Sequence, residues 1–198
     1  MKVFNTIIAL LFFVSGLGAS VDPYDIVVVG DPTNNTLLLR STVAFKHDCQ
    51  LQLLNWEDQA IYVQDLAEGT FLNRRIRQTA IPNGSYTLVM SDATGRTEIP
   101  LSLSRSGVVY EVVKAKRTIY PRVDLQDERI LVVNYTNETG KRVEVSLTNE
   151  NGREVFADRT EGQTIRRAYQ LDQLEAGNYT VTVSSQSVKN YTAAIALQ

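Results

Sequence analysis

The sequence contains few of the residues that most often carry catalysis or crosslinks. Among its 198 residues there are one cysteine, one histidine and one tryptophan. A single cysteine forms no disulfide within the chain, and no second histidine is present to share a catalytic or metal-binding role. The sequence also has no glycine-rich phosphate loop and no calcium loop of the D-x-D-x-D-G type. We therefore expect no enzyme activity, no cofactor and no bound metal.

Residues 1–20, MKVFNTIIALLFFVSGLGAS, differ in character from the rest of the chain. Lys2 is followed by a continuous apolar run at 7–14 and then by small residues. This order is typical of a signal peptide, which we expect to be cleaved after Ala19 or Ser20. The run is too short to span a bilayer, which takes about 20 apolar residues, and no later stretch is long enough. We therefore expect an exported protein with no membrane span.

Charge and cysteine content limit the cellular locations and the classes of partner that we expect for this protein. Without the signal peptide the chain has 19 basic and 22 acidic residues, a net charge of −3. This balance gives no electrostatic reason to expect nucleic acid as a partner. Export without disulfides fits a bacterial envelope better than a disulfide-rich eukaryotic secreted module. The expected location is the periplasm, the cell surface or the medium.

Apolar and polar residues alternate through the remainder of the chain, and helical periodicity is nearly absent. Turn signals separate the alternating runs, which is the pattern of short strands in antiparallel β-sandwiches. The strongest hairpin signal is Asn151-Gly152, for which we expect a tight turn with positive φ at both residues. The alternating runs occur at 51–54, 99–103, 130–133, 143–147 and 179–183.

The alternating pattern occurs twice. Residues 81–90, IPNGSYTLVM, correspond to residues 174–183, LEAGNYTVTV, after a shift of 93 positions, and flanking segments align after a shift of 94. Apolar residues of one copy align with apolar residues of the other. The changes between a shift of 94 and a shift of 93 positions fall in predicted turns, where insertions are tolerated. We predict two tandem immunoglobulin-like antiparallel β-sandwich domains, at 21–115 and 120–198. Pro121 interrupts strand pairing at the boundary.

Each copy contains a Gly-x-Tyr triplet at the start of a predicted strand. The glycine permits a sharp turn with positive φ, and the tyrosine places its ring in the core and its hydroxyl on a backbone partner. This arrangement is a tyrosine corner, so we interpret the triplets as structural. They are formed by Gly84 with Tyr86 and by Gly177 with Tyr179.

The second copy carries a specific succession of motifs. Residues 143–156, VEVSLTNENGREVF, combine a strand, an Asn-Gly hairpin and another strand. The pattern Leu-x-x-Leu-x-x-Gly-x-Tyr follows at 171–179, and NYTAAIAL forms a last strand. This succession resembles the carboxy-terminal sorting domain of type IX secretion cargo in Bacteroidota, over about 122–198 with a looser echo over 36–103. The resemblance implies a sandwich fold and a route to the cell surface.

Cys49 and His47 share one face of a predicted strand and are the candidate nucleophile and base, respectively. Cys49 is also expected to face the same side of the strand as Leu51 and Leu53, which are two and four residues further on. The corresponding residue of the second copy is Val143. We therefore interpret Cys49 as a small buried apolar residue.

Trp56 is the candidate binding residue, at the tip of the first hairpin, where the second copy has Glu150. An exposed indole stacks on a sugar ring or anchors a protein partner, and the alternative is an indole folded over its own sheet.

Arg74 aligns with Arg167. We interpret this pair as charges that protect an edge strand from aggregation, with an acidic-ligand stripe as the alternative.

The resulting hypothesis is an exported, non-enzymatic structural or interaction protein that binds another protein in the cell envelope or at the surface. A carbohydrate-binding module and a type IX secretion substrate are the alternatives.

Six asparagines begin N-x-S/T triplets, which we interpret as products of Asn-rich turns followed by Thr-rich strands rather than as glycan sites. They are Asn34, Asn83, Asn134, Asn137, Asn178 and Asn190.

A fusion experiment separates the sandwich fold from the sorting signal. Residues 120–198, joined to a periplasmic reporter in a strain with type IX secretion, should leave the reporter in the envelope. The reason is that the sequence ends in Leu-Gln, whereas the sorting domains end in a basic residue. Reporter without the segment is the control, and the measurement is reporter activity at the surface and in the medium. Efficient surface delivery would contradict the expectation.

Overall fold

The structure is a computed structural model that describes residues 25–31, 36–77, 81–104 and 107–198. The expected cleavage sites at Ala19 and Ser20 lie outside these residues. In the described residues, the regular elements are β-strands apart from one 3₁₀ helix, η3 (Val112–Lys114). The chain divides into two compact units between Thr118 and Ile119. The predicted fold class, two tandem immunoglobulin-like antiparallel β-sandwiches, is confirmed.

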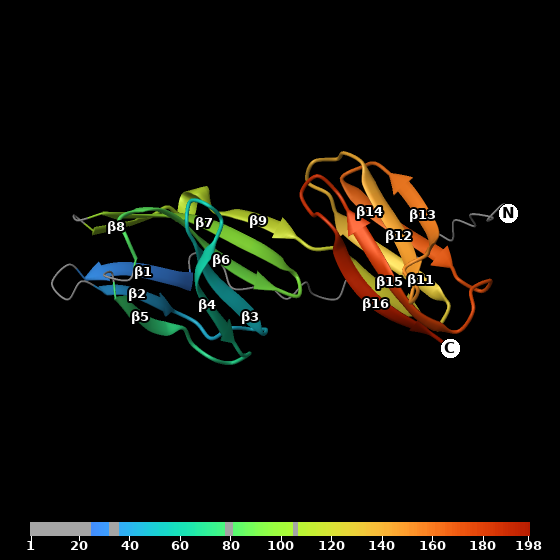
Figure 1. The fold of residues 1–198 in the computed structure, drawn as a ribbon, viewed down its shortest axis with the longest axis horizontal. Helices are drawn as coiled ribbons and strands as arrows, with labels where there is room; N and C mark the ends of the chain where they lie inside the picture. The colour runs from blue at the N-terminus through green and yellow to red at the C-terminus, as the bar shows by residue number, and fades with distance from the viewer. Residues whose placement is uncertain (1–24, 32–35, 78–80, 105–106) are drawn as a thin grey trace. The chain divides into compact units, whose positions relative to one another are not determined.

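The first sandwich has a three-stranded sheet in the order β1-β2-β5 and a larger sheet in the order β4-β3-β6-β7-β8, with β9 also paired to β7 (Figure 1). The strands are β1 (Ile26–Asp31), β2 (Thr36–Ser41), β3 (Cys49–Leu54), β4 (Ala60–Leu66), β5 (Asn73–Arg77), β6 (Gly84–Asp92), β7 (Gly95–Ser104), β8 (Gly107–Tyr110) and β9 (Lys116–Ile119).

The core of the first sandwich follows from the alternation of its strands. Leu37 and Leu39 of β2 are fully buried, as are Leu51 and Leu53 of β3, and all four belong to one apolar cluster. Because successive side chains on a strand point to opposite faces, each strand contributes only its alternate residues to this cluster. Each buried leucine contributes about 1.5–3 kcal/mol to folding.

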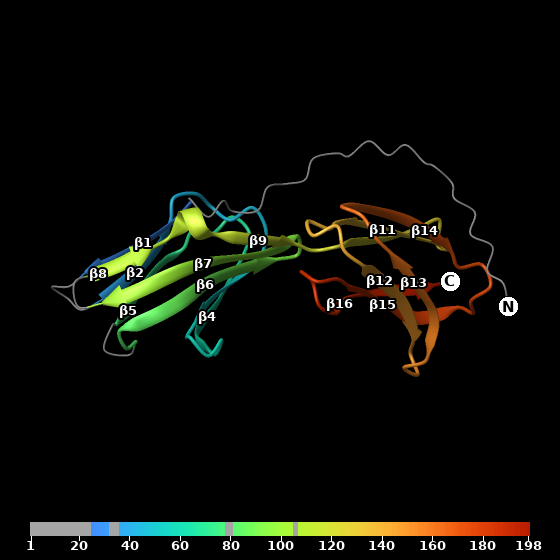
Figure 2. The ribbon, with the colours of Figure 1, turned by 90° about the horizontal axis from the view of Figure 1, so that it is seen from above.

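One side of the first sandwich is closed by strands from different sheets, because β1 lies next to β8 (Figure 2). Gly30 of β1 makes this approach possible. A Cβ atom at Gly30 would lie 2.7 Å from Cγ2 of Val108, which is closer than real Cβ contacts. Any larger residue at position 30 therefore requires the side chain of Val108 or one of the two strands to shift.

The second sandwich has a three-stranded sheet in the order β10-β11-β14 and a four-stranded sheet in the order β13-β12-β15-β16. Between them lies a second apolar cluster that includes Leu131, Val145 and Val181. The strands are β10 (Arg122–Gln126), β11 (Ile130–Thr136), β12 (Val143–Asn149), β13 (Glu154–Thr160), β14 (Thr164–Gln170), β15 (Gly177–Ser184) and β16 (Tyr191–Leu197).

Strand register reproduces the repeat seen in the sequence. Leu53 pairs with Leu88 between β3 and β6, and Leu147 pairs with Val181 between β12 and β15. The copies differ at one edge, because β8 pairs with β7, whereas no strand in the described part of the chain pairs with the corresponding edge of β16. The rings of Tyr120 and Tyr191, 5.5 Å apart, pack together in this second sandwich.

The β3–β4 and β12–β13 hairpins have the same turn. In the first, Oδ1 of Asn55 accepts hydrogen bonds from the backbone N–H groups of Glu57 and Gln59, at 3.0 and 2.9 Å. In the second, Oδ1 of Asn149 accepts from the residues at the same two offsets, at 3.1 and 3.0 Å. This local bonding of the asparagine side chain stabilises each turn.

The type of tight turn predicted at Asn151-Gly152 is wrong, although the hairpin itself is present. Only Gly152 has positive φ, 76°, because the loop is longer than two residues and needs a left-handed residue at one position alone. Asp58 occupies that position in the first hairpin, with φ of 59°. An aspartate has a higher conformational energy than a glycine in this left-handed conformation, since its Cβ atom lies too close to the following carbonyl oxygen.

Exchanging these two residues should therefore change the two sandwiches in opposite directions. We expect Asp58→Gly to stabilise the first by up to about 1 kcal/mol and Gly152→Asp to destabilise the second by a similar amount. Hydrogen exchange of the full-length protein in increasing urea, read by mass spectrometry, follows each sandwich separately. A change of the same sign in both would show that the turns do not share this constraint.

Candidate functional site

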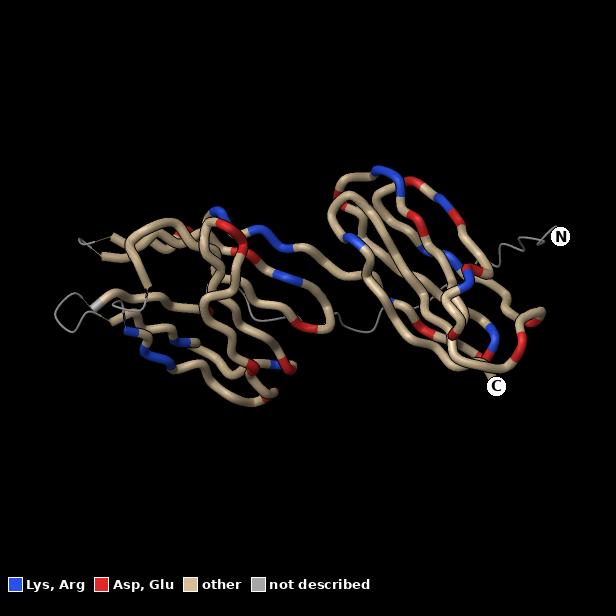
Figure 3. The backbone as a smooth tube through the Cα atoms, viewed as in Figure 1, with Lys and Arg blue, Asp and Glu red and all other residues tan. Residues whose placement is uncertain are grey.

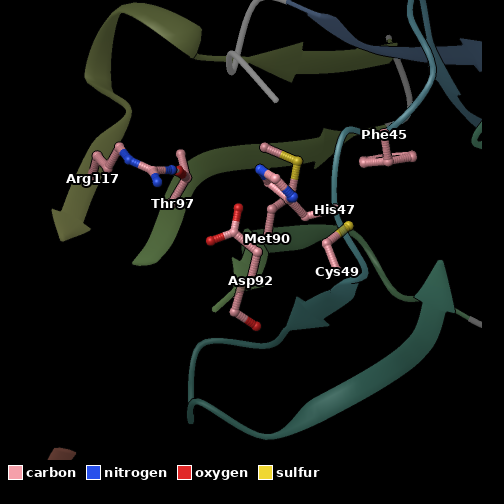
Figure 4. Close-up of a pocket in the computed structure, with 8 residues that line it drawn as sticks. Phe45, His47, Cys49, Met90, Asp92, Thr97 and Arg117 are labelled. Carbon is pink, nitrogen blue, oxygen red and sulfur yellow. The ribbon is translucent and has the colours of Figure 1, made fainter. Parts of the chain in front are cut away.

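The pocket around Cys49 is where the sequence places its candidate nucleophile and base. It lies in the first sandwich, and Figure 4 shows its lining side chains. Its volume is about 10 Å³, close to the minimum needed for a single water molecule. A small-molecule substrate therefore has no room here. The lining residues are Phe45, His47, Cys49, Met90, Ser91, Asp92, Thr97 and Arg117.

The thiol of Cys49 is in an environment that suppresses reactivity. Burial raises its pKa to about 11, and the charges of Asp92 and Asp48 act in the same direction. The thiol is therefore protonated at neutral pH, whereas the thiolate is the nucleophilic form. The prediction that His47 and Cys49 share a strand face is wrong, because β3 begins at Cys49 and His47 is exposed in the loop before it. Within the described residues, no hydrogen bond joins His47 to Cys49. Cys49 is half-buried and not fully buried as predicted, but it packs against the core of the first sandwich, which supports its interpretation as a small apolar residue.

The remaining polar groups of the pocket hold a hairpin together. Oδ1 of Asp92 accepts hydrogen bonds from the backbone N–H groups of Thr94 and Gly95, at 2.7 and 2.9 Å. Arg117 of β9 donates to Oγ1 of Thr97 at 3.0 Å and to Oγ1 of Thr94 at 2.9 Å. These bonds fasten β9 to the β6–β7 hairpin, so the cluster is structural.

Trp56 is 78% exposed at the tip of the β3–β4 hairpin, so its indole does not fold back over the sheet. The same hairpin carries two further exposed apolar residues on β4, Ile61 and Val63, at 42% and 50%. Strand β4 is an edge of its sheet. Glu150 is exposed at the corresponding turn of the second copy. The first hairpin thus presents an apolar surface that the second lacks at its tip.

The tyrosines of the two Gly-x-Tyr triplets are buried and make matching hydrogen bonds. Oη of Tyr86 donates to the carbonyl oxygen of Pro82 at 2.6 Å, and Oη of Tyr179 donates to that of Glu175 at 2.9 Å. In each case the acceptor lies four residues upstream. The expected positive φ is found at Gly177, 154°, but Gly84 does not have it.

Arg74 and Arg167 occupy edge strands β5 and β14, and each reaches across to the facing sheet. Nε of Arg74 donates to Oε1 of Gln64 on β4 at 3.1 Å. Nη2 of Arg167 donates to Oγ1 of Thr160 on β13 at 2.8 Å. Both arginines therefore bridge the open side of their own sandwich, a structural use that sequence reasoning did not identify.

The asparagines of the N-x-S/T triplets are in different environments. Asn137 is fully buried, and its Nδ2 donates to the carbonyl oxygens of Lys141 and Gly162 at 2.6 and 2.9 Å. A buried, doubly bonded amide is inaccessible to modification, which fits the interpretation of this triplet as part of a turn. Asn190 has φ of 53°, a left-handed conformation that asparagine tolerates. Asn34 lies outside the described residues.

Other kinds of site are also missing from the part of the chain that the structure describes. No group of three or more His, Cys, Asp or Glu residues comes together in a way that would hold a metal ion. No described helix has the length and apolar character needed to cross a membrane.

Three comparisons with known proteins show what the chain is similar to. No family model matches the sequence, and a search of curated proteins finds no match. The structure is similar to "Biofilm associated protein - BSP domain" at 15% identity and a TM-score of 0.31, over 87% of this chain and 29% of that one. It is also similar to a two fibronectin type-III domain segment from chicken tenascin, at 16% identity and a TM-score of 0.30, over 88% and 97% of the two chains. These scores are too low to carry an argument, so the fold rests on the strands themselves.

The pKa of Cys49 gives a direct test of its inertness. Alkylation of the native protein by iodoacetamide should be slow at neutral pH and should accelerate only as pH rises toward about 11, because the thiolate is the reacting form. The urea-unfolded chain is the control and should react with a midpoint of about 8.5, the ordinary thiol pKa. Rates are read by mass spectrometry of the Cys49 peptide. A native midpoint at or below the control would restore Cys49 as a nucleophile.

Proposed function

We propose that this chain is an exported, non-enzymatic interaction protein of a bacterial envelope or cell surface that binds another protein. The observation that carries the proposal is the exposed indole of Trp56 at a hairpin tip, together with Ile61 and Val63 on the same hairpin. Tryptophan is a frequent energetic anchor of protein interfaces, and exposed apolar surface of this kind is characteristic of binding sites. The size of the Cys49 pocket and its protonated thiol support a non-catalytic role.

A protein partner accounts for the hairpin better than a sugar does. Ile61 and Val63 are aliphatic, and they add apolar area that a protein interface buries. A sugar site places polar groups around a stacking ring, and Glu57, Asp58 and Gln59 are exposed beside Trp56, but a sugar leaves the aliphatic area of Ile61 and Val63 unburied. A carbohydrate-binding module is the alternative, supported by the exposure of Trp56 and by these flanking polar groups.

The type IX sorting role is a second alternative for the second sandwich. The sequence resemblance to sorting domains supports it. Leu171 and Tyr179 are buried in the core of that sandwich, and Leu197 is buried at the end of its last strand, β16. The same burial serves folding alone, so it does not distinguish a sorting signal from a structural domain.

Substitution of Trp56 tests the main proposal. The full-length protein is cross-linked in its native envelope fraction, and captured proteins are quantified for wild type, Trp56→Glu and Phe71→Ala. The first variant takes the residue that the second copy uses at the same turn, and Phe71, 62% exposed, is the matched aromatic control. Loss of a partner hot spot costs about 2 kcal/mol or more, so capture with Trp56→Glu should fall about 30-fold.

Three outcomes separate the hypotheses. Capture that is unchanged in Trp56→Glu would remove this hairpin from the interface. Equal losses in Trp56→Glu and Phe71→Ala would indicate a general effect on the fold. Binding to a glycan array that Trp56→Glu abolishes, with no protein captured by wild type, would favour the carbohydrate alternative.

A further inference from the structure

The three-stranded sheet of the first sandwich has an outer face of unusual composition. Leu37 and Leu39 of β2 point into the core, so residues of the opposite parity on β2 and its neighbours point away from it. Those residues combine aliphatic and arginine side chains, and we call this set the arginine face. It consists of Val27, Val29, Leu38, Arg40, Arg75 and Arg77.

The strand register brings the three arginines together. Arg40 pairs with Asn73, and Leu38 pairs with Arg75, so Arg40 and Arg75 are diagonal neighbours on adjacent strands. Arg77 is two residues beyond Arg75 on the same face, about 7 Å along the strand. Figure 3 shows the basic positions of β2 and β5 grouped on this sheet. All three side chains belong to exposed residues, and none forms an ion pair with another described residue.

Apolar side chains lie among these charges. Val27 pairs with Arg40, and Val29 pairs with Leu38. Val27 and Val29 are 37% and 46% exposed. The arginine face therefore offers apolar area flanked by positive charge on one sheet surface.

The second copy shows that the fold does not need these arginines. The equivalents of Arg40, Arg75 and Arg77 in the matching register of β11 and β14 are neutral: Asn134, Ala168 and Gln170. Where the first copy has Val27 and Val29, the second has Arg122 and Asp124, whose side chains form an ion pair at 2.7 Å. The second copy has Arg166 where the first has Asn73, so its outer face has one arginine outside an ion pair, whereas the first copy has three.

Arg74 provides the contrast within the same strand. It bridges β5 to Gln64 of the facing sheet, and its equivalent, Arg167, is also an arginine that bridges two sheets. The arginine with a structural contact is thus present in both copies. The three arginines without a described partner are present only in the first, which points to a use outside the fold.

We propose that the arginine face binds an acidic protein segment in which carboxylates alternate with aliphatic residues. This inference rests on the proposed function, a protein partner, and adds the chemistry of that partner. Guanidinium groups bind carboxylates through paired hydrogen bonds, and arginine is enriched at interfaces. The overall charge of the protein is negative, −2 for the whole chain, so this positive surface is local and directs an acidic partner to one sheet.

The aliphatic residues favour a protein over other anions. Val27, Val29 and Leu38 gain free energy by burying apolar area against aliphatic side chains. Single-stranded nucleic acids and sugars are held by aromatic rings that stack on bases or sugar rings, and the arginine face contains no aromatic residue. A nucleic acid duplex, which basic side chains hold through its phosphates, would leave the aliphatic residues exposed. A sulfated polysaccharide would use the charges but leave the apolar rows exposed.

Peptide binding to the full-length protein tests this assignment. The probe is a labelled short peptide that alternates Glu with Val, and its affinity is measured by fluorescence anisotropy. The variant Arg40→Asn, Arg75→Ala, Arg77→Gln carries the residues of the second copy, so it should fold normally. Its affinity should fall about tenfold or more, the sum of three exposed charge pairs. Peptides with Gln in place of Glu, or with Ser in place of Val, should bind more weakly to wild type.

A second variant controls for net charge. Arg153→Gln, Arg166→Asn, Lys189→Gln removes the same number of positive charges from exposed residues of the second sandwich, and it should bind the Glu-Val peptide like wild type. Equal binding by the two triple variants would overturn the proposal. So would a sulfated oligosaccharide that binds as tightly as the peptide, or self-association that the first variant abolishes, because the occupant would then be a polysaccharide or a second copy. Envelope capture by Trp56 variants is read separately, so failure here leaves the proposed function standing.

Discussion

Two sheets can face each other in this protein only because each strand presents alternate residues to a shared core. Leu37 and Leu39 on one sheet and Leu51 and Leu53 on the other are fully buried in a single cluster, and the second sandwich repeats this arrangement. With no disulfide available, this apolar burial is the main source of stability. Turns, edge strands and outer faces then vary around a core whose pattern of alternate buried residues is the same in both copies.

The duplication acts as an internal control on the role of each residue. Residues that recur with the same contact, such as the tyrosines bonded to a carbonyl oxygen four residues upstream, serve the fold. Residues that differ at equivalent positions are free of that constraint. Trp56 corresponds to Glu150, and Arg40 corresponds to Asn134. The requirements of the fold therefore do not explain why the first copy has Trp56 and Arg40.

The two surfaces of the first sandwich differ in chemistry and suit different parts of an interface. The β3–β4 hairpin offers an indole at its tip, whereas the outer face of β1-β2-β5 offers three arginines among aliphatic side chains. An indole contributes buried area and a rigid shape, and arginines contribute charge steering and paired hydrogen bonds. Each surface has its own matched variant, so their contributions can be measured independently.

The sequence by itself determined the fold class and the repeat, because period-two alternation is a local property of a strand and survives without knowledge of its neighbours. It also indicated the parity of Cys49, which the structure places beside the core with a raised pKa. Only the tertiary structure decided the use of Arg74 and Arg167, since their partners lie on a facing sheet that no local pattern names. The turn at Gly152 was mispredicted because a loop longer than two residues needs one left-handed residue, not two. The arginine face could not be predicted from the sequence either. Arg40 lies beside Arg75 because of the strand register, which is set by long-range pairing.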